Sequence, residues 1–139
     1  MAKSFTISIV TPEREAFASA VVSVILPGSE GYLGIWANHA PLVSGVEPGV
    51  VALKIDDAGT MQYLAVSSGF VEVSNNAVNL MVDSCEDAGE IDIHRAQKAL
   101  DRARERLTSM ETAIDKERAA VAADRARARL RAAKKEGGR

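Results

Sequence analysis

The chain has 139 residues, is 47% hydrophobic and 26% charged, and carries a formal net charge of −2, which is the composition of an ordered globular protein. This length fits one domain, or a small domain with an appendage. No segment approaches the roughly 20 apolar residues that a membrane-spanning helix needs, so we expect no direct membrane insertion. Cys85 is the only cysteine, which excludes an internal disulfide, and we interpret it as a small buried residue rather than a nucleophile.

The character of the chain changes near residue 89. Residues 1–89 hold 3 basic and 10 acidic side chains together with all four prolines, whereas residues 90–139 hold 14 basic and 9 acidic side chains and no proline. The two balances, −7 and +5, add to the net charge of the chain. We therefore predict a compact, turn-rich acidic body at 1–89, and a basic helical tail at 90–139 that contacts something other than the body.

Segments of strand character, separated by turn signals, follow one another through the body. Phe5–Ile9 alternates apolar and polar residues, and Glu47-Pro48-Gly49 and Asn75-Asn76 are typical turn sequences. This pattern predicts strands over residues 5–9, 22–26, 32–35, 50–55, 61–66, 70–73 and, as the last strand, 78–82. Gly69 is expected at a bulge or bend. Short strands at near-regular spacing favour an all-β sandwich or barrel.

Two signals in the tail disagree about its helices. Asp92 is the expected N-cap of a helix that starts at Ile93. A three–four spacing of apolar residues then predicts one helix that runs through Ile93, Ala96, Leu100, Ala103, Leu107, Met110 and Ile114. Thr108-Ser109-Met110-Glu111 has instead the spacing of a capping box, which would start a second helix there. We interpret this conflict as the trace of a switch between a helical hairpin and one continuous helix; the alternative interpretation is a simple ambiguity of the pattern.

Arginines recur along the tail at helical spacing. Six of them would lie along one side of two neighbouring helices: Arg95, Arg102 and Arg106, then Arg118, Arg125 and Arg129. Two such helices side by side would offer guanidinium groups to a polyanion, although the residues alone favour a solvated face laced with i,i+4 ion pairs. The tail has no aromatic residue for base stacking, so we expect no nucleic-acid partner.

The sequence lacks the common catalytic and metal-binding patterns. It has no Gly-x-x-x-x-Gly-Lys-[Ser/Thr] loop and no Gly-x-Ser-x-Gly elbow, and its histidines, His39 and His94, do not cluster with Cys85 at metal-ligand spacing. We therefore predict no enzyme acting alone, no metal site and no required cofactor.

Several segments together resemble the ε subunit of F-type ATP synthases. They stand in family order over nearly the whole chain: Val10–Glu13, Pro27–Ile35, Asn38–Leu42, Pro48–Val50, Ser68–Val73 and Ile91–Ala96. Trp36-Ala37 and Ser67-Ser68-Gly69 depart mildly from the family pattern. The resemblance implies a β plus α fold, with an N-terminal ten-stranded β-sandwich at 1–89 followed by a C-terminal two-helix antiparallel hairpin at 90–139.

The resemblance implies a function without catalysis by this chain. The ε subunit is a central-stalk (rotor) subunit of the proton- or sodium-translocating F-type ATP synthase. Its sandwich would bind the γ subunit and the c-ring, and its C-terminal helices, when extended toward the α and β subunits, would inhibit ATP hydrolysis. The implied rotor interface consists of Ser29, Glu30, Gly31, Tyr32 and His39. His39 alternatively anchors its own loop through a hydrogen bond.

The resemblance also implies a possible regulatory ATP site. Some bacterial ε subunits bind ATP through the pattern Ile/Leu-Asp-x-x-Arg-Ala, which is complete here at residues 91–96. The implied ATP-binding residues are Glu86, Ile91, Asp92, Arg95, Ala96, Arg125 and Arg129, with Arg118 as a further candidate. Asp92 as a helix cap and Arg95 as an ion-pair partner explain the same residues without a nucleotide.

Two other functions fit the same residues. The chain could be a free-standing nucleotide-sensing protein that uses the hairpin, or a coiled-coil adaptor that pairs through the apolar positions between Ile93 and Ile114.

Met1–Phe5 enters a strand pattern without a signal or transit peptide. This favours a bacterial source, for which the resemblance implies a peripheral protein on the cytoplasmic face of the inner membrane, over a plastid protein at the thylakoid.

Overall fold

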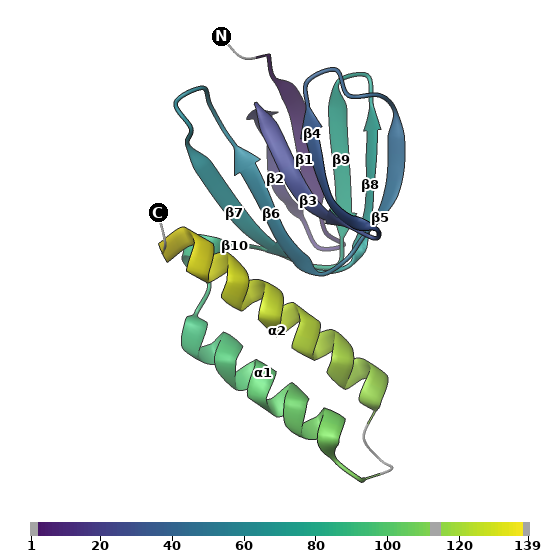
Figure 1. Ribbon diagram of the computed structural model, residues 1–139, viewed down its shortest axis with the longest axis vertical. Coiled ribbons are helices and arrows are strands. Elements are labelled where there is room, and N and C mark those ends of the chain that lie inside the picture. Colours follow the sequence, from purple (N-terminus) through teal and green to yellow (C-terminus); the bar gives the residue numbers. More distant parts are fainter. Residues whose placement is uncertain (1–2, 112–114, 138–139) are drawn as a thin grey trace.

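The computed structural model describes residues 3–111 and 115–137, which form a β-sandwich with a helical hairpin against one side (Figure 1). Within these residues there are ten strands, one short 3-10 turn and two helices. The strands are β1 (Phe5–Val10), β2 (Glu15–Val21), β3 (Ser23–Gly28), β4 (Gly31–Trp36), β5 (Leu42–Val46), β6 (Gly49–Lys54), β7 (Met61–Val66), β8 (Gly69–Ser74), β9 (Ala77–Val82) and β10 (Cys85–Asp87). The 3-10 turn is Ala88–Glu90, and the helices are α1 (Ile93–Thr108) and α2 (Lys116–Gly137). The ten-stranded sandwich and the two-helix hairpin are therefore confirmed.

The strands form one continuous sheet that folds over on itself. Its order is β10-β7-β6-β3-β5-β8-β9-β1-β2, with β4 paired to β3. β3 and β5 meet only at Gly28 and Val46, so the sheet bends there into two layers. The inward faces of the layers enclose a core of aliphatic side chains, among them Ile9, Leu26 and Leu80, which are completely buried. Burial of this apolar surface is the main source of stability of the sandwich.

Residues with positive φ occur at the tight turns between strands. Asn75 and Asn76 have φ of 50° and 58° between β8 and β9, the left-handed geometry of a two-residue hairpin turn. Gly31, with φ of 124°, begins β4. Gly69 is a close-contact position, because a Cβ there would lie 1.8 Å from the carbonyl oxygen of Met81.

Seven strands agree with the sequence prediction, and three were missed. β2 and β10 form the two ends of the sheet order, and β5 has largely exposed or half-buried residues. The prediction that residues 78–82 form the last strand is wrong, because Cys85–Asp87 pairs antiparallel with Leu64–Val66. These strands bury few side chains, so apolar alternation does not reveal them.

The helix caps decide how the tail divides. Asp92 is the N-cap of α1, as predicted, since its Oδ1 accepts from the backbone N of Arg95 at 3.1 Å. The capping box predicted at Thr108 is wrong, because the Thr108 hydroxyl donates back to the carbonyl oxygen of Arg104 at 3.2 Å. Asp115 caps α2 instead, accepting from the backbone N of Arg118 at 3.0 Å.

The predicted apolar seam is confirmed only in the middle of α1. Ala96, Leu100 and Ala103 are buried, whereas Ile93 is 58% exposed and Met110, beyond the end of the helix, is 96% exposed. In this structure α1 ends at Thr108, so the tail has the hairpin arrangement and not the one continuous helix. Ile114 itself lies outside the described residues.

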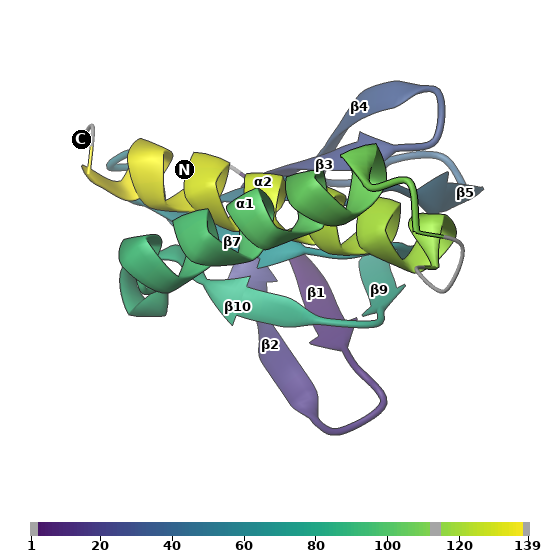
Figure 2. The same cartoon turned by 90° about the horizontal axis from the view of Figure 1, so that it is seen from below.

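Helix α2 lies between α1 and the sandwich (Figures 1 and 2). Its face toward α1 buries Ala123 and Ala126 beside Leu100 and Ala103. Its C-terminal half packs on the outer side of β6 and β7, where the alanines 128, 132 and 133 meet Val50 and Ala65. Alanine buries little area per residue, so the contact between helix and sheet is close but contributes a modest free energy.

Candidate functional site

The segment from 91 to 96 joins the sandwich to α1 and contains the predicted ATP motif. Ile91 and Ala96 are buried in the cluster between α2 and the sheet. Asp92 uses its carboxylate as the helix cap, and Arg95 is exposed. Of these four motif residues, Ile91, Asp92 and Ala96 therefore have a structural role in the absence of any ligand, and within the described residues the Arg95 side chain has none.

Glu86 and Arg129, two other predicted ATP-binding residues, contact one another. Arg129 Nη2 donates to Glu86 Oε2 at 3.3 Å, and Nε lies 2.8 Å from Oε1. The Nε contact is an ion pair without hydrogen-bond geometry, since this buried nitrogen has no hydrogen-bond partner. The pair connects α2 to β10, and so ties the hairpin to the sandwich.

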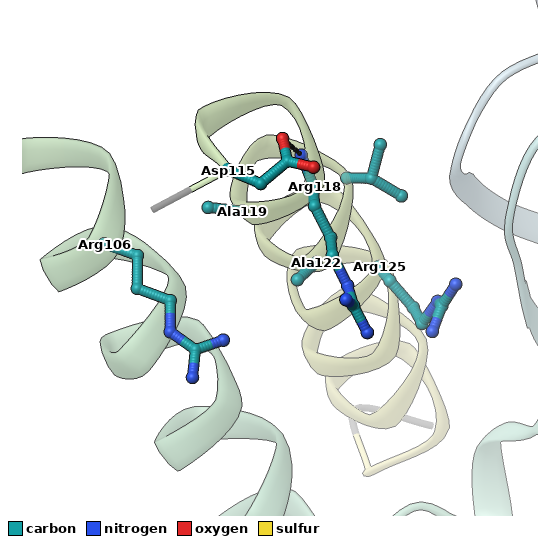
Figure 3. A pocket seen from close by; sticks show the side chains of 7 residues that line it. Arg106, Asp115, Arg118, Ala119, Ala122 and Arg125 are labelled. Atoms are coloured by element: carbon teal, nitrogen blue, oxygen red, sulfur yellow. Dashed lines mark hydrogen bonds between the residues drawn. The ribbon is translucent and has the colours of Figure 1, made fainter. Parts of the chain in front are cut away.

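Arg125 lies in a different environment from Arg129. It lines an open pocket of about 760 Å³ together with Arg106 of α1 and Arg118 of α2. In Figure 3, Arg106 extends from α1 toward α2, and Arg118 lies along α2 beside Ala122. The structure therefore places Arg129 against the sandwich and Arg125 at this pocket.

The predicted rotor residues Ser29–Tyr32 form the exposed tip of the hairpin between β3 and β4. The backbone N of Ser29 donates to the carbonyl oxygen of Gly45 at 3.0 Å. The hydroxyl of Tyr32 accepts from the backbone N of Val50 at 3.3 Å, while 55% of the tyrosine stays exposed. A groove of about 530 Å³ runs between this tip and β5, lined by residues 28–33 and 42–45.

His39 is not beside the other predicted rotor residues. Ser29 and Glu30 precede the start of β4 and His39 follows its end, so the length of a six-residue strand, roughly 20 Å, separates them. His39 Nδ1 lies 2.7 Å from the carbonyl oxygen of Ala40. The neighbouring Asn38 donates its backbone N to Asn76 Oδ1 at 2.7 Å. These contacts favour the interpretation of His39 as part of an anchored loop.

Sequence reasoning missed an exposed apolar row on the outer face of the second layer. Phe70 pairs with Met81, and Met81 pairs with Val10 across β8, β9 and β1. Val43 lies on the adjoining strand β5, on the same face as Gly45, which pairs with Phe70. Phe70 is 56% exposed and Val43 73% exposed. Phe70 and Val71 are adjacent apolar residues on opposite faces of β8, and this was the available signal.

Within the described ranges, no group of three or more His, Cys, Asp or Glu side chains could hold a metal ion. None of the described helices is long and apolar enough to span a membrane. Burial raises the pKa of the Cys85 thiol to about 11, so it stays protonated near neutral pH and is a poor nucleophile.

Comparison with known proteins decides the family. The beta-sandwich domain of the ATP synthase delta/epsilon chain matches residues 4–88, and the long alpha-helix domain of the same chain matches residues 90–134. The chain belongs to the ATP synthase delta/epsilon chain family. As a member of this family, it is a non-catalytic subunit of the ATP synthase complex.

Individual relatives agree with this assignment. The ATP synthase epsilon chain of Desulfitobacterium hafniense (strain Y51) is 42% identical over 111 residues, covering 80% of this chain and 83% of the relative. The epsilon chain of Desulforamulus reducens is 41% identical over 115 residues, covering 83% and 86%. The similarity therefore extends over the sandwich and into the helices.

Solved structures show the same fold. A chain in the Euglena gracilis mitochondrial ATP synthase (OSCP/F1/c-ring) matches with a TM-score of 0.77 at 21% identity, covering 87% of this chain and 76% of that one. A chain of the Tetrahymena thermophila mitochondrial ATP synthase, in a structure of the central stalk and c-ring, matches with a TM-score of 0.57 at 15% identity, covering 97% of both.

Proposed function

We propose that this chain is a rotor subunit of an F-type ATP synthase that joins the γ subunit to the c-ring and inhibits ATP hydrolysis through its helices. The observation that carries this proposal is the separation of two surfaces on one rigid sandwich. The hairpin covers β6 and β7 with small residues, while an exposed apolar row lies on β8, β9 and β1 of the other layer. In this proposal the enzyme lies on the cytoplasmic face of a bacterial inner membrane.

The apolar row of Val10, Val43, Phe70 and Met81 is the proposed γ-binding surface. Contiguous exposed apolar residues on a sheet commonly mark an interface, and the hairpin does not cover them. Replacing Phe70 or Val43 with lysine should abolish co-purification of the chain with γ. The matched control is Ser19→Lys on the edge strand β2. A Phe70→Lys variant that is folded and still binds γ would contradict this assignment.

The tip between β3 and β4 is the proposed contact with the c-ring. Glu30 is exposed there, and the adjacent groove can receive a loop of a partner. Glu30→Gln should reduce proton pumping driven by ATP in the assembled enzyme without lowering the melting temperature of the chain. Glu13→Gln, in the exposed turn after β1, is the control. Loss of stability in Glu30→Gln would make this residue structural instead.

Release of the hairpin is the proposed inhibitory step. The two states of such a switch need to differ by only a few kcal/mol for a partner to choose between them, and the alanine-rich contact of α2 supports a difference of that size. Enzyme assembled with a chain truncated after residue 89 should hydrolyse ATP faster than enzyme with the full chain. Equal rates would argue against inhibition by the helices.

ATP is the proposed regulatory ligand of the junction between sandwich and hairpin. The motif at 91–96 is complete, and its Arg95 is exposed. A ligand that binds only the docked hairpin stabilises it by mass action. Calorimetric titration with ATP should give binding that Arg95→Ala loses and Arg104→Ala keeps. Absence of binding at millimolar ATP would leave the rotor role intact and return Asp92 and Arg95 to structural roles.

A free-standing nucleotide sensor or a coiled-coil adaptor would bind neither the γ subunit nor the c-ring. Co-purification with γ distinguishes the rotor proposal from both alternatives.

A further inference from the structure

The covalent connection between the sandwich and the helices is short. It consists of the 3-10 turn Ala88–Glu90 and the two residues Ile91 and Asp92, which lie between β10 and α1. Helix α1 packs along α2, and α2 lies between α1 and the strands (Figures 1 and 2). A movement of the hairpin away from the sandwich must therefore be absorbed by backbone torsions at or near this connection.

One carboxylate ties the 3-10 turn to the sandwich. Asp87 is the last residue of β10, and its Oδ2 accepts from Nε2 of Gln62 on β7 at 2.7 Å. Its Oδ1 caps the turn by accepting from the backbone N of Gly89 at 2.9 Å. The two oxygens therefore have different partners, one on a strand and one in the turn. Hydrogen bonds to a carboxylate are stronger than those to a neutral acceptor, so the turn is held firmly against β7.

Burial adds to this attachment. Ala88 is 3% exposed and Ile91 is 9% exposed, and both belong to one cluster with Val50 of β6 and Ala65 of β7. The backbone N of Ile91 donates to the carbonyl oxygen of Ala88 at 3.3 Å and so closes the turn. The turn and the side chain of Ile91 are thus in contact with the sheet, and the alanines of α2 complete the same cluster.

The turn and α1 meet at the peptide bond between Ile91 and Asp92. The last hydrogen bond of the turn ends at the backbone N of Ile91. Those of α1 begin at Asp92, whose carbonyl oxygen accepts from the backbone N of Ala96 at 3.0 Å and whose Oδ1 accepts from that of Arg95 at 3.1 Å. Both joining residues are extended, with φ and ψ of −77° and 126° and of −81° and 103°. The ψ torsion of Ile91 and the φ torsion of Asp92 can therefore rotate without breaking either set of hydrogen bonds.

We propose that this peptide is the joint of the hairpin, and that Asp87 and Gln62 are positioning residues that keep the 3-10 turn on the sandwich side of it. Rotation about ψ of Ile91 leaves its side chain in the cluster at the sheet, while the carboxylate of Asp92 moves with α1. Hinges commonly consist of a few residues at the ends of elements that absorb large torsion changes. The released helices therefore pivot about one fixed point instead of swinging on a flexible linker. The use of this joint in inhibition rests on the proposed inhibitory role, whereas its position does not.

The test is native-state hydrogen exchange of the isolated full chain, followed for single residues by NMR. After correction for intrinsic rates, the backbone amides of Gly89 and Ile91 should exchange at least about tenfold more slowly than those in the C-terminal half of α2, because they stay protected when the hairpin opens. Exchange as fast as in α2, or faster, would overturn the proposal, since the turn would then leave with the hairpin or open by itself. The isolated chain gives this result whether or not the helices inhibit ATP hydrolysis.

The positioning contact is tested by Gln62→Met, which removes the hydrogen bond to β10 and keeps the length of the side chain. It should speed exchange at Gly89 and Ile91 about tenfold, toward the rate of α2, while β1 and β9 stay protected. The matched control is Gln97→Met on α1, because Gln97 Nε2 also donates to an aspartate, Asp101 Oδ1, at 3.0 Å. Equal exchange at the two amides in both variants would contradict the positioning role of the contact.

Discussion

Arg129 of α2 forms an ion pair with Glu86 of β10, with Nε 2.8 Å from Oε1 and Nη2 3.3 Å from Oε2. The two residues are 43 positions apart in the chain, and they connect α2 to an edge of the sandwich. A second polar contact lies at the C-terminal end of the same helix, where Lys135 Nζ stands 6.0 Å from the centre of the Tyr63 ring. Polar contacts thus add to the small apolar contact that the alanines of α2 make with β6 and β7.

Breaking the Glu86–Arg129 pair should loosen α2 without unfolding the sandwich. The side chains are 40% and 22% exposed, so solvent screens the pair and a coupling energy of about 0.5–1 kcal/mol is expected. A double-mutant cycle with Glu86→Gln and Arg129→Gln measures this coupling by amide hydrogen exchange in α2. Glu90→Gln, an exposed neighbour, is the control. Additive effects of the two substitutions would show that the contact contributes nothing.

Lys116 should hold the two helices in the hairpin arrangement. Its Nζ donates to the carbonyl oxygens of Arg106 at 2.7 Å and Leu107 at 3.1 Å, and also to that of Ser109. Carbonyl groups at the C-terminus of a helix have no partner within the helix, and a positive charge is favourable there. Lys116→Met should lower the free energy of opening of the last turn of α1 by about 0.5–1 kcal/mol, and so speed hydrogen exchange there.

The control for Lys116 is Lys98→Met, which changes an exposed lysine in the interior of α1. Under the proposed inhibitory role, Lys116→Met should slow ATP hydrolysis by the assembled enzyme, because it weakens only the hairpin. Unchanged exchange rates in the last turn of α1 would show that the lysine contacts are dispensable.

The sequence predicts elements well where one face is buried. The alternation in Phe5–Ile9 identified β1, and the Asp92 side chain identified the start of α1. The edge strands β2 and β10 escaped prediction because their pairing partners, rather than their own side chains, hold them in place. The family resemblance implied the correct number of strands where periodicity did not.

The predicted site could be read from the sequence only in part. Arg125 and Arg129 are four residues apart, so helical spacing predicts that they act together. They face different surroundings because α2 crosses the sandwich, with its C-terminal half against β6 and β7 and its first half beyond them (Figure 1). Such a division depends on the angle between helix and sheet, which is a tertiary property with no local signal.

Enlarging a buried alanine of α2 should detach the helix from the sheet. Ala132 is completely buried beside Val50 and Ala65, and extra methylene groups in a close-packed contact typically cost about 1–3 kcal/mol. Ala132→Leu should therefore increase exchange in the C-terminal half of α2 while leaving β1 and β9 protected. Ala122→Leu, on an exposed position of the same helix, should have little effect. Equal exchange in both variants would mean that the contact adapts to the larger side chain.

Alkaline pH should destabilise the sandwich through Cys85. Burial of the thiol raises its pKa from 9.0 to about 11, so the folded state retains a proton that the unfolded chain loses. The contribution of the protonated thiol to the free energy of unfolding is fully present below about pH 9. It is lost as the pH rises toward 11, by an amount on the order of 2 kcal/mol. Denaturation by urea at pH 8 and pH 10.5 measures this loss, which Cys85→Ala should remove. A wild-type chain and a Cys85→Ala variant that lose the same stability between these pH values would assign the alkaline transition to the lysines and tyrosines instead.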